Sequence, residues 1–595
     1  MQIIILAAGM GNRLKPITNN VPKVMVKVAG KEIILHQLDL LSKLDNVTEI
    51  IIVVGYRKNQ IKSLIGQFYK GIKITYVDND DYAQTNNIYS LFLALKKIKE
   101  DVLLVEGDVI FKPDLLGEIT KHKKDLIFVE KFKPYMDGGV IEIDNKTKLV
   151  KKLIPKRDQD ENFEFNKYYK TVNIYYFTHH FIEKFYKPAL KLYINSYGKK
   201  DYYELIIGSL VYLNLCHLYA HIISKELQWF EIDDSIDLNF AENIFFKKNI
   251  DFIKSKYGGY WNYNFIDFCY LYNRHFPNPS FIKEMMENVS VLINTYPSGQ
   301  EYIKLLLSSF FDYEIDRSKL FVGNGASELI SLINNHIIDS ITIPVPTFSE
   351  YLKVKNKKLI NYYCLSEKNN FKIKPHGLVK EAKKTNFLLL INPNNPTGQV
   401  ISYKDLAYIL ENLKSLKGII LDESFIDFSD EQSGIKLVEK YPNLIFIKSI
   451  SKSYGAAGLR LGYIYTNNQK VKDVLNQYLP IWNINSFAEK FLEKFSKYKE
   501  SFNKSLIMTV RDRQKLMRML QKIKHLKVYS SEANFLLCKI LNPDLNSDKL
   551  SQLLFKYDNI FVKNLDQKIG PSFFRVSVRN EEENKKLVKA LNKYL

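Results

Sequence analysis

Two series of short apolar runs alternate with helical patterns, and this alternation constrains the fold of the 595-residue chain more than any other feature. The first series contains IIILAAG, EIIIVVGY, KITYVD and DVLLVEGDVIF. The second contains KLFVGNG, SITIPVP, NFLLLINP, GIILDES and NLIFIKSIS. Apolar runs of strand length that alternate with amphipathic helices predict mostly parallel sheets covered by helices. We therefore expect an α/β protein.

The length of the chain predicts more than one hydrophobic core. We expect one domain over residues 1–248 and a second over 259–595, joined by a short linker at 249–258. The glycine- and aromatic-rich stretch KSKYGGYWNYN, within residues 250–264, marks this boundary. Between residues 131 and 176 the pattern changes to hairpin-like pieces, GGVIEID and then KLVKKLI, which predict an inserted substrate-binding subdomain. Helical patterns followed by KVYSSEANFLLCKI and FFRVSVRN predict a smaller C-terminal subdomain.

Composition restricts the class of partner. The formal net charge is +21, but the lysines are spread along the chain without a basic block, which favours anionic phosphate substrates over nucleic acid. The chain contains no apolar run of the roughly 18 residues that a membrane span needs. The cysteines are widely separated and form no CxxC pair or zinc spacing, which indicates a reducing, cytoplasmic location. They are Cys216, Cys269, Cys364 and Cys538.

A glycine-rich segment, LAAGMGNRLKPITNNVPK, follows the first apolar run. Gly9 and Gly11 permit tight turns and a close approach of backbone amides to phosphate oxygens. Arg13 and Lys23 can then place positive charge on a leaving pyrophosphate. The spacing differs from the GxxxxGK[ST] phosphate loop. The segment therefore predicts a different kind of nucleoside triphosphate site, with Lys23 and Arg13 as catalytic candidates.

This segment resembles the signature of the nucleotidyltransferases that activate sugar phosphates and alkyl phosphates. The resemblance implies a Rossmann-like domain that uses Mg²⁺. By the same resemblance, Asp108 in VEGDVIF and Asp233 in WFEIDDSIDL would hold the metal. Two carboxylates that hold Mg²⁺ against substrate phosphates are a typical arrangement. Asp234 is adjacent to Asp233, and a shift of one residue stays open.

The stretch YAQTNNIYSL looks like the cytidylyltransferase branch that acts on phosphocholine and related aminoalkyl phosphates. That resemblance implies CTP, with Asn87 and Ser90 available to hydrogen-bond the cytosine edge. The alternative is a helix N-cap at Thr85 or Asn86. The predicted nucleotide-binding residues are Leu6, Ala7, Ala8, Gly9, Gly11, Asn12, Lys23, Asn87, Ser90 and Asp108. Aromatic and acidic candidates for binding a small cationic amine are Tyr135, Asp137, Tyr175, Trp229 and Glu231.

A second motif set begins far downstream. In SISKSYGAAGLR, Lys452 is flanked by small residues, and its amine can form a Schiff base with an aldehyde cofactor while Arg460 and the serines hold a phosphate. Asp422 follows the apolar run GIIL, a suitable position for a carboxylate paired with a pyridinium nitrogen. Asn395 lies in NPNNPTG, where its amide can reach a ring oxygen. GNGAS precedes a predicted helix whose free amides can bind phosphate.

Together these motifs resemble the fold-type I aminotransferases that use pyridoxal 5'-phosphate (PLP), particularly the branch of histidinol-phosphate aminotransferase and threonine-phosphate decarboxylase. The resemblance implies a large and a small subdomain, with Lys452 as Schiff-base lysine and proton carrier. It also implies a homodimer, because Tyr296 in NTYPSGQ matches a tyrosine that reaches the phosphate from a partner subunit. The implied cofactor-binding residues are Gly325, Ala326, Ser327, Phe348, Asn395, Asp422, Ser449, Ser451, Lys452, Arg460 and Tyr296.

Two arginines and one phenylalanine concern the substrate of this second site. Arg575 in FFRVSVRN matches the arginine that grips a substrate carboxylate, and Arg579 is a second anion-binding candidate. Both have structural ion pairs as the alternative. Many aminotransferases have tyrosine at the position of Phe425, whereas the decarboxylase-like relatives often have phenylalanine. Transamination and decarboxylation therefore both stay open.

Two motif sets in one chain predict a bifunctional enzyme. The leading hypothesis is transamination of phosphonoacetaldehyde, with alanine as amino donor, to 2-aminoethylphosphonate, followed by transfer of CMP from CTP to that product. This resembles the phosphonate cytidylyltransferase–aminoethylphosphonate transaminase fusions. The alternative is a phosphocholine or phosphoethanolamine cytidylyltransferase fused to a histidinol-phosphate aminotransferase-like or threonine-phosphate decarboxylase-like enzyme. A PLP-containing regulator is disfavoured, since nucleotidyltransferase motifs occupy the region where a DNA-binding module would lie.

Overall fold

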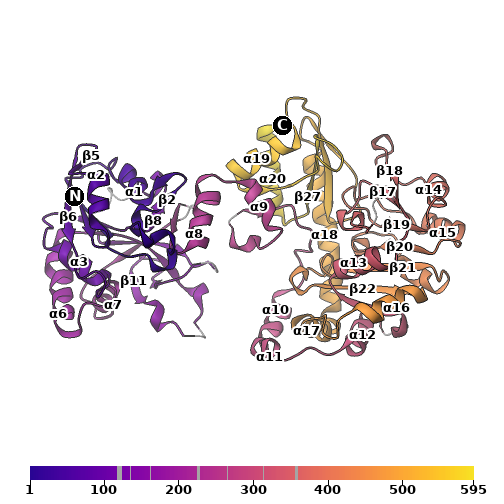
Figure 1. Ribbon diagram of the computed structural model, residues 1–595, viewed down its shortest axis with the longest axis horizontal. Helices are drawn as coiled ribbons and strands as arrows, with labels where there is room; N and C mark the ends of the chain where they lie inside the picture. Colours follow the sequence, from indigo (N-terminus) through magenta and orange to yellow (C-terminus); the bar gives the residue numbers. More distant parts are fainter. Residues whose placement is uncertain are drawn as a thin grey trace. The chain divides into compact units, whose positions relative to one another are not determined.

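The computed structural model divides the chain into two compact units, Met1–Asn264 and Phe265–Leu595 (Figure 1). Each unit has its own sheet and its own hydrophobic core, as the length of the chain predicts. The predicted fold class is confirmed. The residues that the structure describes are 1–116, 124–133, 136–160, 163–223, 228–263, 265–312, 314–355 and 359–595.

The first unit is built on a ten-stranded mixed sheet. Strand β1 is parallel to β4 and to β7, and β4 is parallel to β6, so four neighbouring strands point the same way. The strand order is β11-β10-β12-β7-β1-β4-β6-β5, and β9 joins β12 to β13. The strands are β1 (Gln2–Ala7), β4 (Glu49–Val54), β5 (Phe68–Tyr69), β6 (Ile72–Asp78), β7 (Val102–Glu106), β9 (Leu126–Lys131), β10 (Val140–Ile143), β11 (Val150–Ile154), β12 (Tyr169–Phe177) and β13 (Tyr219–Ile222).

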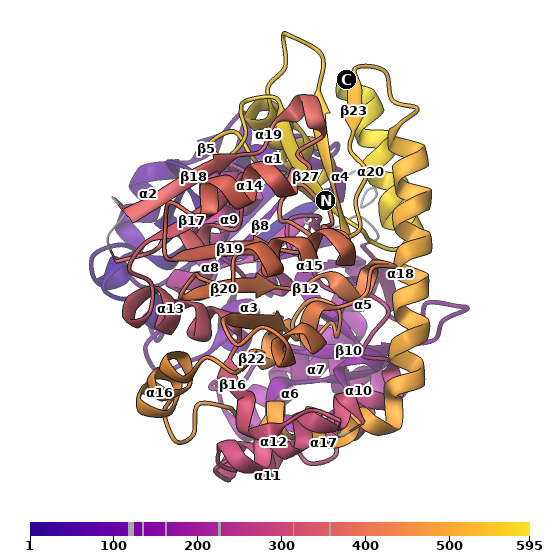
Figure 2. The same cartoon turned by 90° about the vertical axis from the view of Figure 1, so that its right-hand side faces the viewer.

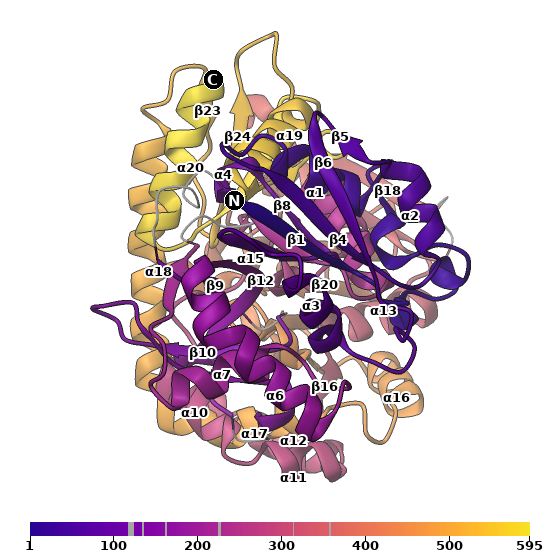
Figure 3. The same cartoon turned by 90° about the vertical axis from the view of Figure 1, so that its left-hand side faces the viewer.

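Helices cover both faces of this sheet because the central strands are apolar on both faces. Ile3 and Ile5 of β1 pack in the cluster that contains the buried residues of α1 and α2. Ile4 and Leu6 pack in the other cluster, with buried residues of α3, α6 and α7. These three helices lie next to one another in Figure 3. The helices of both faces are α1 (Ile33–Leu41), α2 (Lys58–Ile65), α3 (Asn87–Leu95), α6 (Lys187–Tyr197) and α7 (Glu204–Tyr212).

The expectation of a separate inserted subdomain at 131–176 is wrong. Strands β10 and β11 form the predicted antiparallel hairpin, but β10 pairs with β12, and β12 pairs with β7 of the main sheet. The hairpin therefore extends the sheet, because its backbone hydrogen bonds find a partner strand there. Its connecting segments still line the cavity described below.

The second unit contains a seven-stranded sheet with the order β16-β22-β21-β20-β19-β17-β18, in which β22 is antiparallel to both neighbours. Leu388 and Leu390 of β19 pack with the helices α14 (Pro375–Ala382) and α15 (Tyr403–Asn412), whereas Leu389 packs with α13 (Ala326–His336) and α16 (Gln469–Tyr478). The strands are β16 (Leu320–Asn324), β17 (Ile341–Val345), β18 (Ile360–Cys364), β19 (Phe387–Ile391), β20 (Gly418–Asp422), β21 (Leu444–Ser449) and β22 (Leu461–Thr466).

A smaller C-terminal layer completes this unit, as predicted. The long helix α18 (Lys499–Leu520) runs along one edge of the unit into an antiparallel sheet of order β23-β24-β27-β26 (Figure 2). Helix α20 packs against α18 and α19, burying apolar side chains of all three helices. The elements are β23 (Leu526–Val528), β24 (Phe535–Ile540), α19 (Ser547–Asp558), β26 (Lys563–Asn564), β27 (Phe573–Ser577) and α20 (Glu581–Tyr594).

Among the described residues, no helix is both long enough and apolar enough to cross a membrane. The four cysteines are all free thiols. The cytoplasmic location stays a prediction.

Candidate active sites

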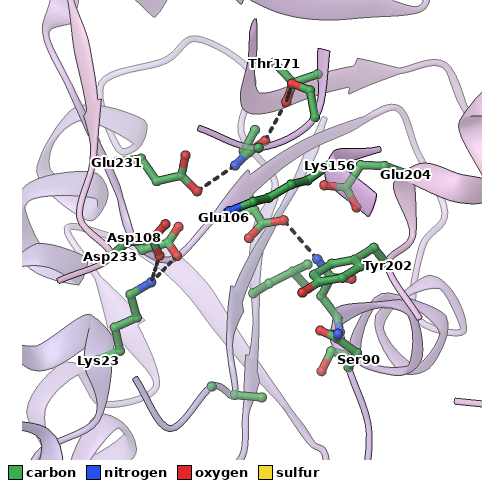
Figure 4. A pocket seen from close by; sticks show the side chains of 18 of the residues that line it. Lys23, Ser90, Glu106, Asp108, Lys156, Thr171, Tyr202, Glu204, Glu231 and Asp233 are labelled. Atoms are coloured by element: carbon green, nitrogen blue, oxygen red, sulfur yellow. Dashed lines mark hydrogen bonds and ion pairs between the residues drawn. The ribbon is translucent and has the colours of Figure 1, made fainter. Parts of the chain in front are cut away.

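A cavity of about 610 Å³ opens at the carboxyl ends of β1 and β7 in the first unit (Figure 4). Parallel strands place the residues that follow them at one edge of the sheet, which explains why the first glycine-rich segment and Asp108 meet there. All the predicted nucleotide-binding residues line this cavity, as do Arg13 and Asp233. The structure thus brings Lys23 into contact with Asp233, which lies 210 positions further along the chain.

Two glycines make room for the cavity wall. Gly11 has a positive φ of 65°, and a Cβ there would lie 2.9 Å from the Cβ of Lys23. A Cβ on Gly107 would lie 2.5 Å from the carbonyl oxygen of Leu6. A larger residue at either position would displace Lys23 or Asp108 from the cavity, because the neighbouring backbone and the first side-chain carbons cannot move aside.

Lys23 lies between two carboxylates. Its Nζ is 2.6 Å from Asp108 Oδ2 and 2.8 Å from Asp233 Oδ1, while Arg13 is 2.7 Å from the same Asp233 oxygen. Burial opposes the charge on Lys23, but the two carboxylates outweigh it and raise the pKa of the ammonium. Burial likewise opposes ionisation of Asp233, yet Lys23 and Arg13 hold the pKa of this carboxyl below its usual value. Lys23 therefore stays protonated and Asp233 stays ionised, and the positive charge on Lys23 is what a phosphate site requires.

The carboxylates fit a hard divalent cation. Oxygens of Asp108, Glu231 and Asp233 lie within 4.8 Å of one another. Asp108 Oδ1 is buried and has no hydrogen-bond partner among the described residues, so it is available as a ligand. Asp234 is placed differently. It caps α8 (Ser235–Phe240), accepting hydrogen bonds from the backbone of Ile236 and Asp237. The geometry thus puts Asp233 in the cavity and Asp234 in a helix cap.

The predicted base-reading residues lie at the start of α3. Asn86 is the N-cap of this helix, as the alternative interpretation predicts, and its side chain accepts a hydrogen bond from the backbone N–H of Asn87. Ser90 Oγ accepts a 3.0 Å hydrogen bond from Asn79, which leaves the hydroxyl hydrogen free to donate. The amide of Asn87 donates to Glu106 Oε1 at 3.2 Å and accepts from the backbone N–H of Tyr203 at 3.1 Å. Asn87 is thus fixed at the cavity wall by Glu106, Tyr203 and Glu204.

Three half-buried glutamates form an acidic wall, most of which the sequence does not predict. Glu106, Glu204 and Glu231 line the same cavity, and only Glu231 was singled out beforehand. Burial first, and then the mutual repulsion of neighbouring carboxylates, raises the pKa of Glu106. Burial raises the pKa of Glu204 and of Glu231 to about 7. Lys170 Nζ lies 3.5 Å from Glu231 and compensates one charge only. The wall is thus short of cations and suits a positively charged ligand group.

The remaining predicted amine-binding residues separate into three groups. Asp137 lines the cavity, where Lys156 Nζ is 2.5 Å from its Oδ2. Trp229 is buried beside the cavity and donates to Glu130 at 2.7 Å. Tyr175 is fully buried and is not among the lining residues, because β12 carries it past the cavity into the core beneath Tyr203. A direct ligand role for Tyr175 is therefore incorrect. Tyr135 lies outside the described residues.

In the second unit, Asp422 ends β20 and is held by two hydroxyls. Tyr351 donates to Asp422 Oδ2 at 2.8 Å, and Ser424 donates to Oδ1 at 2.5 Å. Burial raises the pKa of Asp422, whereas these hydroxyls oppose that shift. Lys452 is half-buried, and desolvation of its amine, followed by Arg575 and Arg460, lowers its pKa to about 8. An amine of lowered pKa beside a fixed carboxylate fits the reactive end and the pyridine nitrogen of PLP.

The predicted phosphate-binding residues meet at the N-terminus of α13. Arg460 lies so close to Gly325 that a Cβ there would be 2.4 Å from its guanidinium. Gly462 of β22 lies equally close to α13, because a Cβ on Gly462 would be 2.3 Å from the backbone nitrogen of Ala326. Ser451 Oγ is buried without a partner among the described residues, and Ser449 N–H donates to Ser424. Free donors at a helix N-terminus fit the cofactor phosphate.

Arg575 and Arg579 have different hydrogen-bond partners. Arg575 donates to Asn395 Oδ1 at 2.6 Å, which leaves the NH₂ group of Asn395 for a ring oxygen. Arg579 makes two 3.0 Å bonds to Glu583 and one to Tyr272. The prediction that Arg579 binds a substrate anion is therefore wrong, since its donors are used within the protein, as the ion-pair alternative foresaw.

Two aromatic predictions concern the cofactor ring and the partner subunit. Phe348 lies directly before Tyr351's 3₁₀ turn, with 6.5 Å between the two ring centroids. Tyr296 is 79 % exposed and stacks on Trp482, with 4.4 Å between the two ring centroids. Its proposed reach into a partner subunit stays a prediction.

The two sites define an enzyme with a nucleotidyltransferase domain and a PLP-dependent domain. Residues 2–203 match the nucleotidyl transferase family, and residues 266–591 match the family described as aminotransferase class I and II. The chain belongs to the aminotransferase class I and II family and carries a nucleotidyl transferase domain in front of it. These families imply PLP for the second unit and a divalent metal such as Mg²⁺ for the first.

Three similar proteins carry informative names. CMP-5'-(3-aminopropyl)phosphonate synthase of Streptomyces rubellomurinus is 28 % identical and aligns over 99 % of this chain and 94 % of its own. L-serine phosphate decarboxylase of Campylobacter jejuni is 34 % identical over 55 % of this chain and 87 % of its own. The solved histidinol-phosphate aminotransferase of Clostridium acetobutylicum is 28 % identical, with a TM-score of 0.50, over 56 % of this chain and all of its own.

Proposed function

We propose that the first unit transfers CMP from CTP to the phosphonate oxygen of 2-aminoethylphosphonate, giving CMP-aminoethylphosphonate and pyrophosphate. One observation carries this proposal. A single cavity of about 610 Å³ is lined both by the cations Arg13 and Lys23, which suit phosphate, and by the half-buried glutamates Glu106 and Glu204. A small acceptor with an anion at one end and an ammonium at the other is complementary to both.

The reaction requires positioning more than covalent chemistry. The acceptor oxygen attacks the α-phosphorus of CTP, a new P–O bond forms, and the bond to the pyrophosphate oxygen breaks. Lys23 and Arg13 stabilise the negative charge that grows on the leaving pyrophosphate. Mg²⁺, when bound by Asp108 and Asp233, supplies further positive charge to the phosphate oxygens. Gly9 and Gly11 let backbone amides approach those oxygens closely.

The acidic wall supports an amine-bearing acceptor. Glu204 Oε2 is buried and has no hydrogen-bond partner among the described residues. A protonated amine would relieve the cost of this group and of its neighbours Glu106 and Glu231. The full-length relative from Streptomyces rubellomurinus is named for an aminoalkylphosphonate product, which supports the same chemical class here.

The second unit, in our proposal, makes that amine by transamination of phosphonoacetaldehyde with alanine. Lys452 Nζ takes the proton from the carbon that bears the amino group and returns it to the acceptor carbon. Its lowered pKa of about 8 suits this task near neutral pH. PLP supplies the electron sink for this proton transfer. Asp422, fixed by Tyr351 and Ser424, keeps the pyridine nitrogen protonated.

Decarboxylation of an amino acid that bears a phosphonate or phosphate is the second candidate for this unit. Two observations favour it. The relatives named L-serine phosphate decarboxylase are 34 % and 30 % identical over 87 % and 88 % of their lengths. Phe425 is buried and packs edge-to-face on Phe535, so no hydroxyl is supplied at that position. The product would again be a short ω-amino anion, the acceptor class proposed for the first unit.

A homodimer through the second unit is part of the proposal. Tyr296, Trp482 and Ile481 are 79 %, 50 % and 70 % exposed, an apolar group that a second copy could cover. Mass photometry at nanomolar concentration should give twice the mass of one chain. A mass of one chain would remove the partner role of Tyr296.

Acceptor competition tests the first reaction. The protein is incubated with CTP, Mg²⁺ and either 2-aminoethylphosphonate, phosphoethanolamine or phosphocholine, and pyrophosphate is measured. We expect the highest kcat/KM with 2-aminoethylphosphonate, and a preference for either phosphate ester would overturn the phosphonate assignment. Glu204→Gln should raise KM for the acceptor and leave KM for CTP unchanged. ATP in place of CTP tests the base preference.

The two candidate PLP reactions are separated by their by-products. Transamination consumes alanine and yields pyruvate with no gas. Decarboxylation releases one CO₂ per amine and needs no amino donor. Pyruvate formed with phosphonoacetaldehyde supports the first, and ¹³CO₂ from carboxyl-labelled 2-amino-3-phosphonopropionate or O-phosphoserine supports the second.

A further inference from the structure

Three cationic side chains of the small C-terminal layer converge near the proposed cofactor site. Lys563 in β26 and Arg575 in β27 are directly opposed cross-strand partners, so their side chains lie on the same face of the sheet. Lys568 belongs to the segment between these strands, and its Nζ donates to the carbonyl oxygen of Thr347 at 3.1 Å. Together we name Lys563, Lys568 and Arg575 the cation triad.

The cation triad has no acidic partner among the described residues. None of the three forms an ion pair with a described carboxylate. The nearest acid that influences Lys568 is Glu350, which is itself 2.9 Å from Lys353. The side chain of Lys568 is exposed, yet the protein atoms around its ammonium, and then Arg575 and Lys563, lower its pKa to about 8. The charges therefore repel one another and are compensated only in part, by Asp267 at Arg575 and by Glu350 at Lys568.

Arg575 supplies an unused donor. The residue is only 7 % exposed, and two of its nitrogens donate to Asn395 Oδ1 and to the carbonyl of Cys269. Its Nε is buried and has no hydrogen-bond partner in the described part of the chain. An unpaired buried donor on a charged group is costly, so a ligand acceptor is expected there.

The cation triad also lies next to the residues assigned to the cofactor. Thr347, the acceptor for Lys568, directly precedes Phe348, and Asn395 is bonded to Arg575. Lys452 is close enough to Arg575 for that charge to lower its pKa. An anion held by the triad would thus be within reach of the reacting carbon.

We propose that Lys563, Lys568 and the Nε of Arg575 form a subsite for the dianionic head group of the substrate, a phosphonate or a phosphate ester, and that it selects this substrate over simple amino acids. The proposal rests on the function proposed for the second unit. One carboxylate balances a single cation, whereas a phosphonate dianion balances two and offers three acceptor oxygens. Alanine, the amino donor, has no second anionic group that could bind Lys563 or Lys568.

Calorimetric titration of the holoprotein tests this subsite without turnover. The probes are methylphosphonate, methyl phosphate and acetate at constant ionic strength. Lys568→Met and Lys563→Met should each weaken methylphosphonate binding roughly tenfold or more, the scale of a lost charged hydrogen bond, and leave acetate unchanged. The matched control is Lys524→Met, which changes an exposed lysine of the same layer that forms no ion pair with a described residue.

Kinetics give the second readout. Lys568→Met should raise KM for the phosphonate-bearing substrate by the same factor while KM for alanine and kcat change less than twofold. Lys568→Arg should restore most of the affinity, which separates charge from loss of folding. Unchanged methylphosphonate affinity in both methionine variants would overturn the proposal. If wild type binds methylphosphonate through Lys568 but forms no amine, the subsite stands and the proposed reaction fails. Equal affinity for methyl phosphate assigns the subsite to the head group in general.

Discussion

Replacing Asp233 and Asp234 one at a time separates a catalytic carboxylate from its structural neighbour. Asp233 Oδ1 touches two cations, Lys23 at 2.8 Å and Arg13 at 2.7 Å, whereas Asp234 caps α8 and faces its backbone. Asp233→Asn keeps the size of the side chain but removes a charge that positions Lys23. Lys23 retains its 2.6 Å contact with Asp108, so the fold should tolerate the change.

The expected loss follows from this geometry. Removing one group that organises transition-state charge lowers kcat by roughly 10² to 10³, which corresponds to about 3 to 4 kcal/mol. Asp234→Ala should leave kcat within twofold and lower the free energy of unfolding of the first unit by about 1 kcal/mol, the usual cost of a lost N-cap. Pyrophosphate release at saturating CTP and Mg²⁺, together with thermal unfolding, measures both. A large kcat loss in Asp234→Ala with a mild effect in Asp233→Asn would refute the assignment.

Three further predictions concern the second unit. Lys452→Ala should abolish the visible absorbance of bound PLP and all amine formation but leave pyrophosphate release intact; loss of both activities would contradict independent sites. Since the Lys452 amine must be neutral to react with the PLP aldehyde and its pKa is lowered to about 8, the rate of PLP uptake by apoprotein should rise with pH and level off near pH 8; a rise that continues to pH 10 would show an ordinary lysine. Burial raises the pKa of Glu423 from 4.5 to about 7, although hydrogen bonds from Ser433 and Gly434 oppose this shift. The folded unit therefore binds this proton more tightly than the unfolded chain, and its free energy of unfolding should fall as pH rises from 4.5 to about 7. Denaturant titrations should show a shallower fall over that window in Glu423→Gln, and an unchanged slope would contradict the shift.

Local motifs explain which parts of the sites were predictable from sequence. Gly9, Gly11 and Lys23 lie within one segment whose spacing is itself informative, and Asp108 directly follows an apolar strand. The same holds for Lys452 among its small neighbours. In these cases one short stretch contains both the strand and the turn that present the functional group, so no tertiary contact had to be guessed.

The missed residues depend on long-range packing. Glu204 begins α7 and reaches the acidic wall only because that helix packs on β11, and Asn79 meets Ser90 across a loop. Tyr351 reaches Asp422 from 71 positions away. Nothing in their own segments marks them as ligands.

Some errors had a signal in the sequence. Arg579 precedes Glu583 by four residues, the spacing of a helical ion pair, which the structure forms. Short strands and long loops at 131–176 favoured the prediction of a separate subdomain. The apolar strand β12, however, needs a partner strand on each side, and it pairs with β7 and β9.

The central claim is that one chain both forms a short aminophosphonate and activates it with CMP. A single ³¹P NMR experiment tests it most directly, with the PLP-loaded protein, Mg²⁺, CTP, alanine and phosphonoacetaldehyde in one tube. We expect loss of the phosphonoacetaldehyde signal, transient 2-aminoethylphosphonate, and then a pair of coupled resonances from a phosphonate–phosphate anhydride with equimolar pyrophosphate. Coupled resonances that appear only with a phosphate ester, or none with any amino acceptor, would contradict it.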